Sequence, residues 1–346
     1  MKLADLTVEA VRERLRDASL SHAESLSKAR QFIRVAEALV QRGAAGSARA
    51  YAHFVPGRIE VLGKHTDYAG GRSIVAAVER GFCMIAVPRA DGRVRVLAVE
   101  RDELVECELE ADLRVPQSGW TNYPLTVMRR LARNFGQLLG ADIAFLSDLP
   151  PAAGMSSSSA FMVAIYLTLA ARNELSARDV YCQAIESDLE LAAYLGTIEN
   201  GQSFGSLAGD RGVGTFGGSE DHTAILCSES GNLGQFAYCP ARLERRLAVP
   251  EECVFVIGFS GVVAEKTGAA QDLYNRAALQ VRTIVDVWQR VTESDQVYLA
   301  DVLRSAPDAA EALQAVLREA TDAAYAPAQL EQRLRHFLLE DGQIID

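Results

Sequence analysis

The amino-acid sequence predicts an α+β protein, because apolar residues at helical spacing alternate with short apolar runs that are typical of strands. Its 346 residues exceed the size of one ordinary hydrophobic core, so about two domains are expected. Hydrophobic residues at 49% and charged residues at 23% are typical of globular chains. We expect a domain boundary near Pro240 to Pro250, with an N-terminal domain over 1–240 and a C-terminal domain over 241–346.

The individual elements follow from spacing and from turn residues. Leu26, Phe32 and Leu39 repeat at helical spacing, and Gly43 ends that helix. An Asp-Gly pair at 91–92 is typical of a hairpin turn. In chain order, the sequence predicts a helix over 23–42, strands over 50–55 and 58–62, a hairpin over 82–99, a helix over 120–135, a strand over 142–147, helices that begin within 156–159 and near Ser176, a buried strand over 253–258, a long helix over 265–291 and helices in the last part of the chain.

Composition and charge exclude several classes of protein. A net charge of −11 argues against a nucleic-acid surface, which needs clustered Lys and Arg. The six cysteines show no CxxC spacing, so neither a zinc ribbon nor a disulfide framework is indicated. The sequence has no apolar run of membrane-spanning length, and its N-terminus lacks a signal-peptide core. We therefore expect a cytoplasmic monomer with reduced thiols and with no nucleic-acid or membrane partner.

The segment LPPAAGMSSSSAFMVA, residues 149–164, is the strongest candidate for a phosphate site. A small-residue loop leads into serines that open an apolar helix, and the free N–H groups at a helix N-terminus suit a phosphate. Serines are also common helix caps, but a run of four after a glycine loop favours phosphate binding. A nucleophilic serine is the rival interpretation, and the segment lacks the Gly-x-Ser-x-Gly pattern that such a serine needs.

Two further clusters combine glycine with ionisable residues. The first, GKHTDYAGG over 63–71, differs from a Walker A loop, because Gly57 and Gly63 stand too far apart and His65 replaces Ser or Thr. The second is GVGTFGGSEDHTAIL over 212–226, in which glycines allow close approach of a ligand and Asp221 is placed to act as a base. Taken alone, the second cluster is better explained by a plain glycine-rich turn with solvated acids, followed by an apolar strand.

Together, the clusters resemble the motifs of the galactokinase branch of the GHMP small-molecule kinases. PGRIEVLGKHTDYAGG resembles the galactokinase signature, and the serine run resembles the second motif of the superfamily. GGSEDH resembles the segment that carries the catalytic Asp, while WTNY and FSGVVAEKTGAAQDLYNRA resemble two further family segments in the same order. The resemblance covers about 50–290. It implies a two-domain GHMP kinase fold, with a ribosomal S5 domain 2-like N-terminal domain and a ferredoxin-like C-terminal domain.

The resemblance also implies a reaction, which is the phosphorylation of the anomeric hydroxyl of a monosaccharide by ATP with Mg²⁺. Asp221 would accept or orient the hydroxyl proton, and Arg58 would stabilise charge on the phosphoryl group. For the metal, Glu220 and Asp210 are the nearest competitors of Glu199. The implied site residues are Arg58 and Asp221 for catalysis; Lys64, His65, Asp67, Gly218 and Tyr274 for the sugar; Gly154, Ser156, Ser157, Ser158 and Trp120 for the nucleotide; and Ser158 and Glu199 for the metal.

This sequence departs from the family pattern in several places. Lys64 stands where the family has a Glu that binds the terminal sugar hydroxyl, and this exchange raises the alternative of a kinase for galacturonate or arabinose. Glu60 and Ala69 replace two Asn residues, and His222 replaces Gln. The last glycine-rich family motif is absent, so a truncated C-terminal domain is expected. An inactive, galactokinase-like sugar sensor is the alternative from another class.

Overall fold

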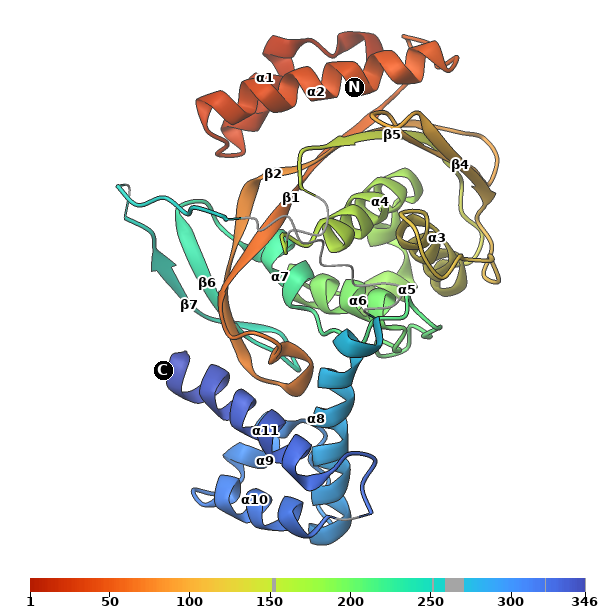
Figure 1. Ribbon diagram of the computed structural model, residues 1–346. Helices are drawn as coiled ribbons and strands as arrows, with labels where there is room; N and C mark the ends of the chain where they lie inside the picture. The colour runs from red at the N-terminus through yellow and green to blue at the C-terminus, as the bar shows by residue number, and fades with distance from the viewer. Residues whose placement is uncertain (151–153, 251, 259–270, 321, 346) are drawn as a thin grey trace.

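The computed structural model describes residues 1–150, 154–250, 252–258, 271–320 and 322–345 (Figure 1). Its strands are β1 (Tyr51–Leu62), β2 (Arg72–Pro88), β3 (Arg93–Ala98), β4 (Glu103–Glu108), β5 (Ala141–Ser147), β6 (Asn232–Ala237) and β7 (Arg242–Ala248). Its α-helices are α1 (Val8–Asp17), α2 (His22–Gln41), α3 (Asn122–Phe135), α4 (Ser157–Asn173), α5 (Asp179–Cys182), α6 (Asp188–Asn200), α7 (Glu220–Cys227), α8 (Gln271–Thr292), α9 (Leu299–Arg304), α10 (Ala309–Glu319) and α11 (Pro327–Phe337). The α+β class predicted from the sequence is confirmed.

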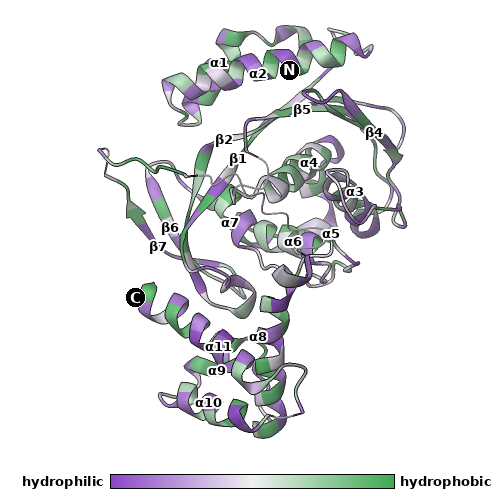
Figure 2. Ribbon diagram, in the orientation of Figure 1, coloured by the Kyte–Doolittle hydropathy of each residue, from purple (hydrophilic) through white to green (hydrophobic). Residues whose placement is uncertain are grey.

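Seven strands of the described chain form one sheet, which separates two helical layers (Figure 1). The strand order is β4-β3-β5-β2-β6-β7, and β1 pairs with β2 as a branch from this path. Helices α1 and α2 cover one face of the sheet. Helix α2 is amphipathic, and Figure 2 shows hydrophilic and hydrophobic residues mixed along it. Helices α3, α4, α6 and α7 lie on the other face, where α4 is buried over most of its length. The larger core lies on this second face and supports the site.

The described residues from Gln271 onward are mostly helical, and they form a core of their own. Helices α8, α10 and α11 pack around Ile284, Leu313 and Leu334, all of which are fully buried. A π-helical turn, Leu338–Ile344, extends α11. Ala69 and Tyr68, from the loop between β1 and β2, also pack into this core. The helical unit therefore contacts the same turn that the sequence singled out. The division into two domains at residue 240 stays a prediction. Strand β7 begins after this boundary, but it pairs with β6 in the same sheet.

Two predictions about strands were wrong because local patterns do not report pairing between distant segments. The ranges 50–55 and 58–62 belong to one strand, β1, since the long strand β2 pairs with both and an irregularity between Pro56 and Arg58 absorbs the break. The predicted hairpin over 82–99 does turn at 91–92, but β5 lies between β2 and β3 and pairs with each. The amide of Gly140, just before β5, donates to the carbonyl of Asp91 at 2.7 Å and fixes this insertion.

Three further predictions were wrong. An apolar strand was expected after residues 219–222, where the chain forms helix α7, whose apolar residues face the buried side of the sheet. The predicted strand over 253–258 has no regular secondary structure and pairs with no described strand, and Val254 is 82% exposed. Near Ser176, a 3₁₀ turn and the four-residue α5 replace the expected helix. The predicted helix over 265–291 is described from Gln271, and 265–270 lie outside the described residues.

Candidate active site

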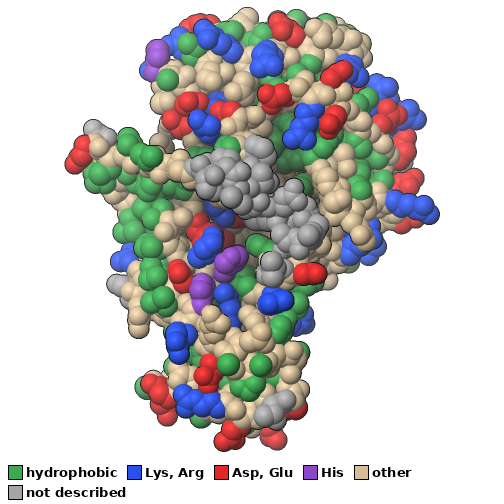
Figure 3. All heavy atoms as spheres, viewed as in Figure 1, with side chains coloured by type: hydrophobic (Ala, Val, Ile, Leu, Met, Phe, Trp, Pro, Cys, Tyr) green, Lys and Arg blue, Asp and Glu red, His purple; other side chains and the backbone are tan. Residues whose placement is uncertain are grey.

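A cavity of about 980 Å³ is lined by β1, by the loop after β1 and by the starts of α4, α7 and α8. Charged and histidine side chains gather on this face, between the sheet and the C-terminal helices (Figure 3). Every residue that the sequence singled out for the site lines this one cavity. They are Arg58, Lys64, His65, Asp67, Trp120, Gly154, Ser156, Ser157, Ser158, Glu199, Gly218, Asp221 and Tyr274.

Arg58 and Asp221 form a buried ion pair at the centre of the cavity. Arg58 lies at the irregular point of β1, and its Nε donates to Asp221 Oδ1 at 2.8 Å. Its Nη1 donates to the carbonyl oxygen of Gly154 at 2.7 Å, which ties the pair to the serine-rich loop. Burial alone would lower the pKa of Arg58, but the carboxylates of Asp221, Glu220 and Glu60 raise it above its ordinary value. Arg58 therefore stays charged at neutral pH, and its guanidinium favours the ionised form of the neighbouring Asp221.

Ser159 links the two carboxylates on this side of the cavity. Its hydroxyl lies 2.9 Å from Glu199 Oε2 and 3.0 Å from Asp221 Oδ2, and the residue is fully buried. A hydroxyl has one proton, so it donates to one of these carboxylates at a time. Sequence reasoning missed Ser159, although it is the last serine of the run 156–159. The signal that identifies it is its place on the inward face of the first turn of α4.

Glu199 lies near the end of α6, where two further polar groups approach its carboxylate. Thr215 Oγ1 lies 3.4 Å from Oε1, and His222 Nε2 lies 3.5 Å from Oε2. His222 stands at a position that the sequence identified as a departure from the family. The structure thus brings Glu199 within reach of Asp221 in spite of the long segment that separates them in the sequence.

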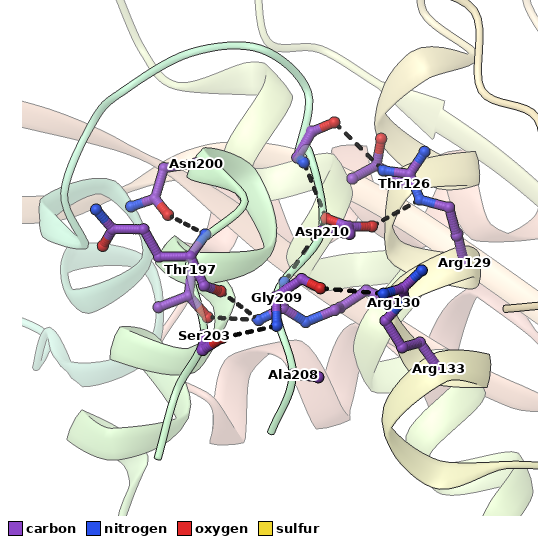
Figure 4. A network of polar contacts seen from close by, with 12 residues as sticks. Thr126, Arg129, Arg130, Arg133, Thr197, Asn200, Ser203, Ala208, Gly209 and Asp210 are labelled. Atoms are coloured by element: carbon purple, nitrogen blue, oxygen red, sulfur yellow. Dashed lines mark hydrogen bonds and ion pairs between the residues drawn. The ribbon is translucent and has the colours of Figure 1, made fainter. Parts of the chain in front are cut away.

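The loop between α6 and α7 is held by a buried network around Asp210 (Figure 4). Arg129 Nε on α3 donates to Asp210 Oδ2 at 2.6 Å, and Arg130 Nη1 lies 3.6 Å from Oδ1. The amide of Gly212 donates to the same carboxylate at 2.8 Å, and the amide of Val213 donates to the carbonyl of Glu199 at 2.9 Å. Asp210 is therefore engaged in fixing the loop, away from the residues that line the cavity. Of the two competitors for the metal, only Glu220 faces the cavity.

The turn over residues 63–72 is the segment that the family resemblance assigns to the sugar, and we call it the sugar turn for that reason. It places His65 and Asp67 in the cavity wall. The backbone amide of Glu220 donates to Asp67 Oδ2 at 3.2 Å. Burial raises the pKa of Asp67 to about 6, although hydrogen bonds from the amides of Glu220 and Tyr68 act in the opposite direction. A side chain at Gly218 would meet Asp67 Oδ2 at 2.5 Å, so this close approach requires glycine. The His65 ring lies 5.7 Å from the ring of Tyr274, edge to face.

Acidic groups outnumber basic groups around the sugar turn. Glu60 lies 3.3 Å from Lys64 Nζ and 3.6 Å from Arg58 Nη2. Glu220 lies 3.7 Å from Arg58 Nε, and burial followed by repulsion from Glu60 and Asp67 raises its pKa well above the ordinary value. The side chain of Lys64 is 62% exposed. The positive charge of Lys64 is thus balanced by the carboxylate of Glu60 at the mouth of the cavity.

The other end of the cavity has the features of a nucleotide site. Helix α4 begins at Ser157 without a side-chain cap, and Ser156 Oγ is buried with no hydrogen-bond partner among the described residues. Gly154 has a φ of +74°, and a Cβ there would meet only open space. Free N–H groups and an uncommitted hydroxyl at a helix start suit a phosphate chain.

An aromatic wall continues from this helix start and suits a nucleotide base. The Trp120 ring lies 5.9 Å from Phe145 and 6.1 Å from Phe161, which stacks on Phe82 at 5.1 Å. The indole N–H of Trp120 donates to Glu103, which fixes the ring. Aromatic faces of this kind offer stacking surface to a planar base.

The donor set also fits magnesium that arrives with a nucleotide. Ser158, Glu199 and Asp221 offer hard oxygen atoms on one side of the cavity. No group of three or more His, Cys, Asp or Glu side chains arranged to hold a metal occurs among the described residues. Mg²⁺ is commonly bound by one or two carboxylates together with substrate phosphates, so a complete protein cage is not required.

Comparisons with known proteins agree with this geometry. Residues 122–206 match the GHMP kinases N terminal domain, and residues 43–88 match the galactokinase galactose-binding signature. The chain is 36% identical over 121 residues to a galactokinase of Chloroflexus aggregans and 37% identical over 123 residues to one of Roseiflexus sp.. Each of these alignments covers 35% of this chain and 31% of the relative, so the chain matches about a third of their length. A galactokinase of Glaesserella parasuis is 26% identical over 244 residues, which cover 65% of this chain and 60% of the relative.

A solved structure extends the likeness to the fold. Lactococcus lactis galactokinase, complexed with galactose, aligns with a TM-score of 0.63 and 20% identity, over 89% of this chain and 72% of that chain. The chain therefore has the fold of the GHMP kinases. The resemblance to galactokinases that the sequence showed is confirmed, as a similarity of motifs over part of the chain and of the fold. Over the residues that the structure describes, no helix has the length and apolar character to cross a membrane.

Proposed function

We propose that the protein transfers the terminal phosphoryl group of ATP to the anomeric hydroxyl of a monosaccharide, as a galactokinase-type sugar 1-kinase. The observation that carries this proposal is that Asp221 contacts both Arg58 and Ser159. These three residues lie between the uncapped start of α4 and the sugar turn. Phosphoryl transfer depends on positioning and charge neutralisation, and this arrangement supplies both.

Each residue then has a defined task. Asp221, kept ionised by Arg58, orients the anomeric O–H and accepts its proton. Arg58 offers its remaining donors to the phosphoryl oxygens, where negative charge develops. The start of α4 binds the phosphates through its N–H groups. Ser158 and Glu199 would hold Mg²⁺, which neutralises phosphate charge when it is bound.

The contacts around the sugar turn favour a neutral sugar such as galactose. A uronic acid would bring a carboxylate to a wall that already carries the carboxylates of Glu60 and Asp67. Lys64 was the sequence feature that suggested such a substrate, and in the structure it pairs with Glu60. Like charges in a partly buried cavity repel, so galacturonate is disfavoured. Arabinose, which lacks a carboxylate, remains an alternative.

The experiment is a panel of galactose, arabinose and galacturonate with Mg²⁺ and ATP, measuring ADP release and sugar phosphate. We expect turnover with a neutral sugar, and Asp221→Asn provides the inactive control. If no sugar raises ADP release above the control while calorimetry shows that a sugar binds, the protein is a sugar sensor, the alternative of another class. The intact Arg58–Asp221 pair favours the kinase over the sensor.

A further inference from the structure

The sugar turn is in contact with the last helical segment of the described chain, which consists of α11 and the π-helical turn after it. Residues of α11 and of the π-helical turn after it make polar contacts with the turn at several points along its length. The amide of Lys64 donates to Glu340 Oε2 at 3.1 Å, and the amide of Arg72 donates to Asp341 Oδ1 at 2.7 Å. These two contacts fix the two ends of the turn. The middle of the turn is held by Arg333.

Arg333 makes the central contact. Its Nη2 donates to the carbonyl oxygen of His65 at 2.6 Å and to the phenol oxygen of Tyr68 at 2.6 Å. The guanidinium also lies over the Tyr68 ring, 5.8 Å from its centroid. Arg333 itself is only 8% exposed. A buried guanidinium is costly unless it finds hydrogen-bond acceptors, so the position of Arg333 is stabilised by these two oxygens.

The backbone that Arg333 holds is under strain. His65 has a φ of +58°, in the left-handed region that residues with a side chain rarely adopt. Such a conformation persists only where the surroundings fix it, and here the carbonyl of the strained residue is the acceptor for Arg333. The same conformation directs the His65 ring toward Tyr274 in the cavity wall. Two residues further along the chain, Asp67 begins the short 3₁₀ helix Asp67–Ala69.

We propose that Arg333 is a positioning residue for sugar binding, which acts through the backbone of the sugar turn without touching the sugar. This inference rests on the proposed function, since it assigns the turn to the sugar. When the guanidinium is removed, the His65 carbonyl and the Tyr68 hydroxyl lose their shared donor. The strained turn then relaxes, and His65 and Asp67 leave their binding geometry. Among the described residues, helix α4 on the nucleotide side packs mainly against β1, β2, α3 and α7, so it should keep its structure.

The test compares Arg333→Gln with Arg335→Gln, a matched control on an exposed residue of the same helix. Calorimetry with galactose in the absence of nucleotide should show about ten- to hundredfold weaker binding for Arg333→Gln, as expected when a charge-assisted hydrogen bond is lost. The KM for Mg-ATP should change by less than about twofold. Arg335→Gln should match the parent in both measurements.

Two milder variants keep the test decisive if Arg333→Gln folds poorly. Arg333→Lys retains a donor and should restore part of the affinity, and Tyr68→Phe removes one acceptor and should weaken binding less than Arg333→Gln does. Equal galactose affinity in the parent and Arg333→Gln would overturn the proposal. So would a fall in turnover with an unchanged sugar KM.

Hydrogen exchange gives a readout that does not depend on the identity of the substrate. The amides of Ala69, Gly70 and Gly71 bond within the turn and should exchange faster in Arg333→Gln, while α4 exchanges as in the parent. If the turn loosens but the parent binds no sugar of the panel, Arg333 still holds the turn, and it is the proposed function that fails. If the turn exchanges equally in both proteins, Arg333 does not hold it, whatever the substrate.

Discussion

The two sides of the cavity are held together in different ways. On the side that we propose binds the phosphates, which we call the phosphate side, side chains contact one another directly. Ser159 lies between Glu199 and Asp221, and Arg58 pairs with Asp221. On the sugar side, the turn after β1 is held through its backbone by a helix near the other end of the chain. The first arrangement lies within the sheet-and-helix layer, whereas the second joins that layer to the C-terminal helices.

Because of this difference, we expect turnover to depend mainly on one side of the cavity and the choice of sugar to depend mainly on the other. Substitutions on the phosphate side are expected to change turnover, because they alter charges around the transferred group. Substitutions on the sugar side are expected to change sugar affinity, because they alter the shape and the protonation of the turn. Single substitutions can therefore break either side separately.

The largest effect is expected from Asp221→Asn, on the phosphate side. The amide keeps the shape of the side chain but removes its negative charge and its capacity to take a proton. General-base assistance contributes typically about 10²–10⁴-fold, so turnover should fall by that factor while galactose affinity is retained. Steady-state kinetics and calorimetry measure the two quantities, with Asp179→Asn on an exposed helix as the control. Turnover equal to that of the parent would show that Asp221 is not the base.

A comparison of Ser159→Ala with Ser158→Ala should sharpen the description of the phosphate side. Ser159→Ala removes the hydroxyl between two carboxylates, and turnover should fall about 10- to 100-fold, the range for a hydrogen bond to a charged group. Ser158→Ala should instead raise the magnesium concentration needed for half-maximal rate and leave turnover at saturating magnesium nearly unchanged. Magnesium titrations of both variants decide the matter. A reversed pattern would move the metal contact to Ser159.

The phosphate side was also the easier side to predict from the sequence. A glycine loop followed by serines, and an Asp after four glycines, are local patterns with a local physical meaning, and the structure brings both to one cavity. The bridging role of Ser159 was missed, because it depends on how α4 faces α6 and α7. The contacts of Asp210 and Arg333 join segments that lie far apart in the sequence, and no local pattern reports them. The same reason explains the misplaced hairpin, since β5 inserts from a distant segment.

On the sugar side, binding should depend on pH through Asp67. Its pKa is raised to about 6 by burial, and only the ionised carboxylate accepts two hydrogen bonds from sugar hydroxyls. Galactose affinity should therefore be nearly constant above pH 7 and about tenfold weaker at pH 5. Calorimetry across this range tests the expectation. Asp67→Asn should bind galactose weakly, and its galactose affinity should lose most of its dependence on pH. Any pH dependence that remains would report Glu220, whose pKa is also raised.

The direction of the stability change separates this effect from acid unfolding. The folded-state pKa of Asp67 lies above its ordinary value of 3.8, so the folded state takes up the proton more readily than the unfolded state. Through this group alone, the folded protein loses stability as pH rises from 3.8 to about 6 and gains stability as pH falls. Weaker sugar binding at pH 5, together with a melting temperature that does not fall, would thus assign the effect to the site. A joint fall of affinity and melting temperature would contradict it.

The smallest effect is expected from Lys64→Gln, although Lys64 is the most conspicuous departure from the family pattern. The side chain is 62% exposed and pairs with Glu60 four residues earlier, and exposed pairs of this kind contribute about 0–1 kcal/mol. The substitution should change galactose kcat/KM by less than about fivefold, and it should leave the ratio of galacturonate to galactose turnover nearly unchanged. Glu60→Gln is the matched partner. It removes a carboxylate from the cavity wall, so it should raise that ratio in favour of galacturonate. If Lys64→Gln lowered the ratio more than tenfold, Lys64 would have to leave Glu60 and reach the sugar, and the preference for a neutral substrate argued from its ion pair would be wrong.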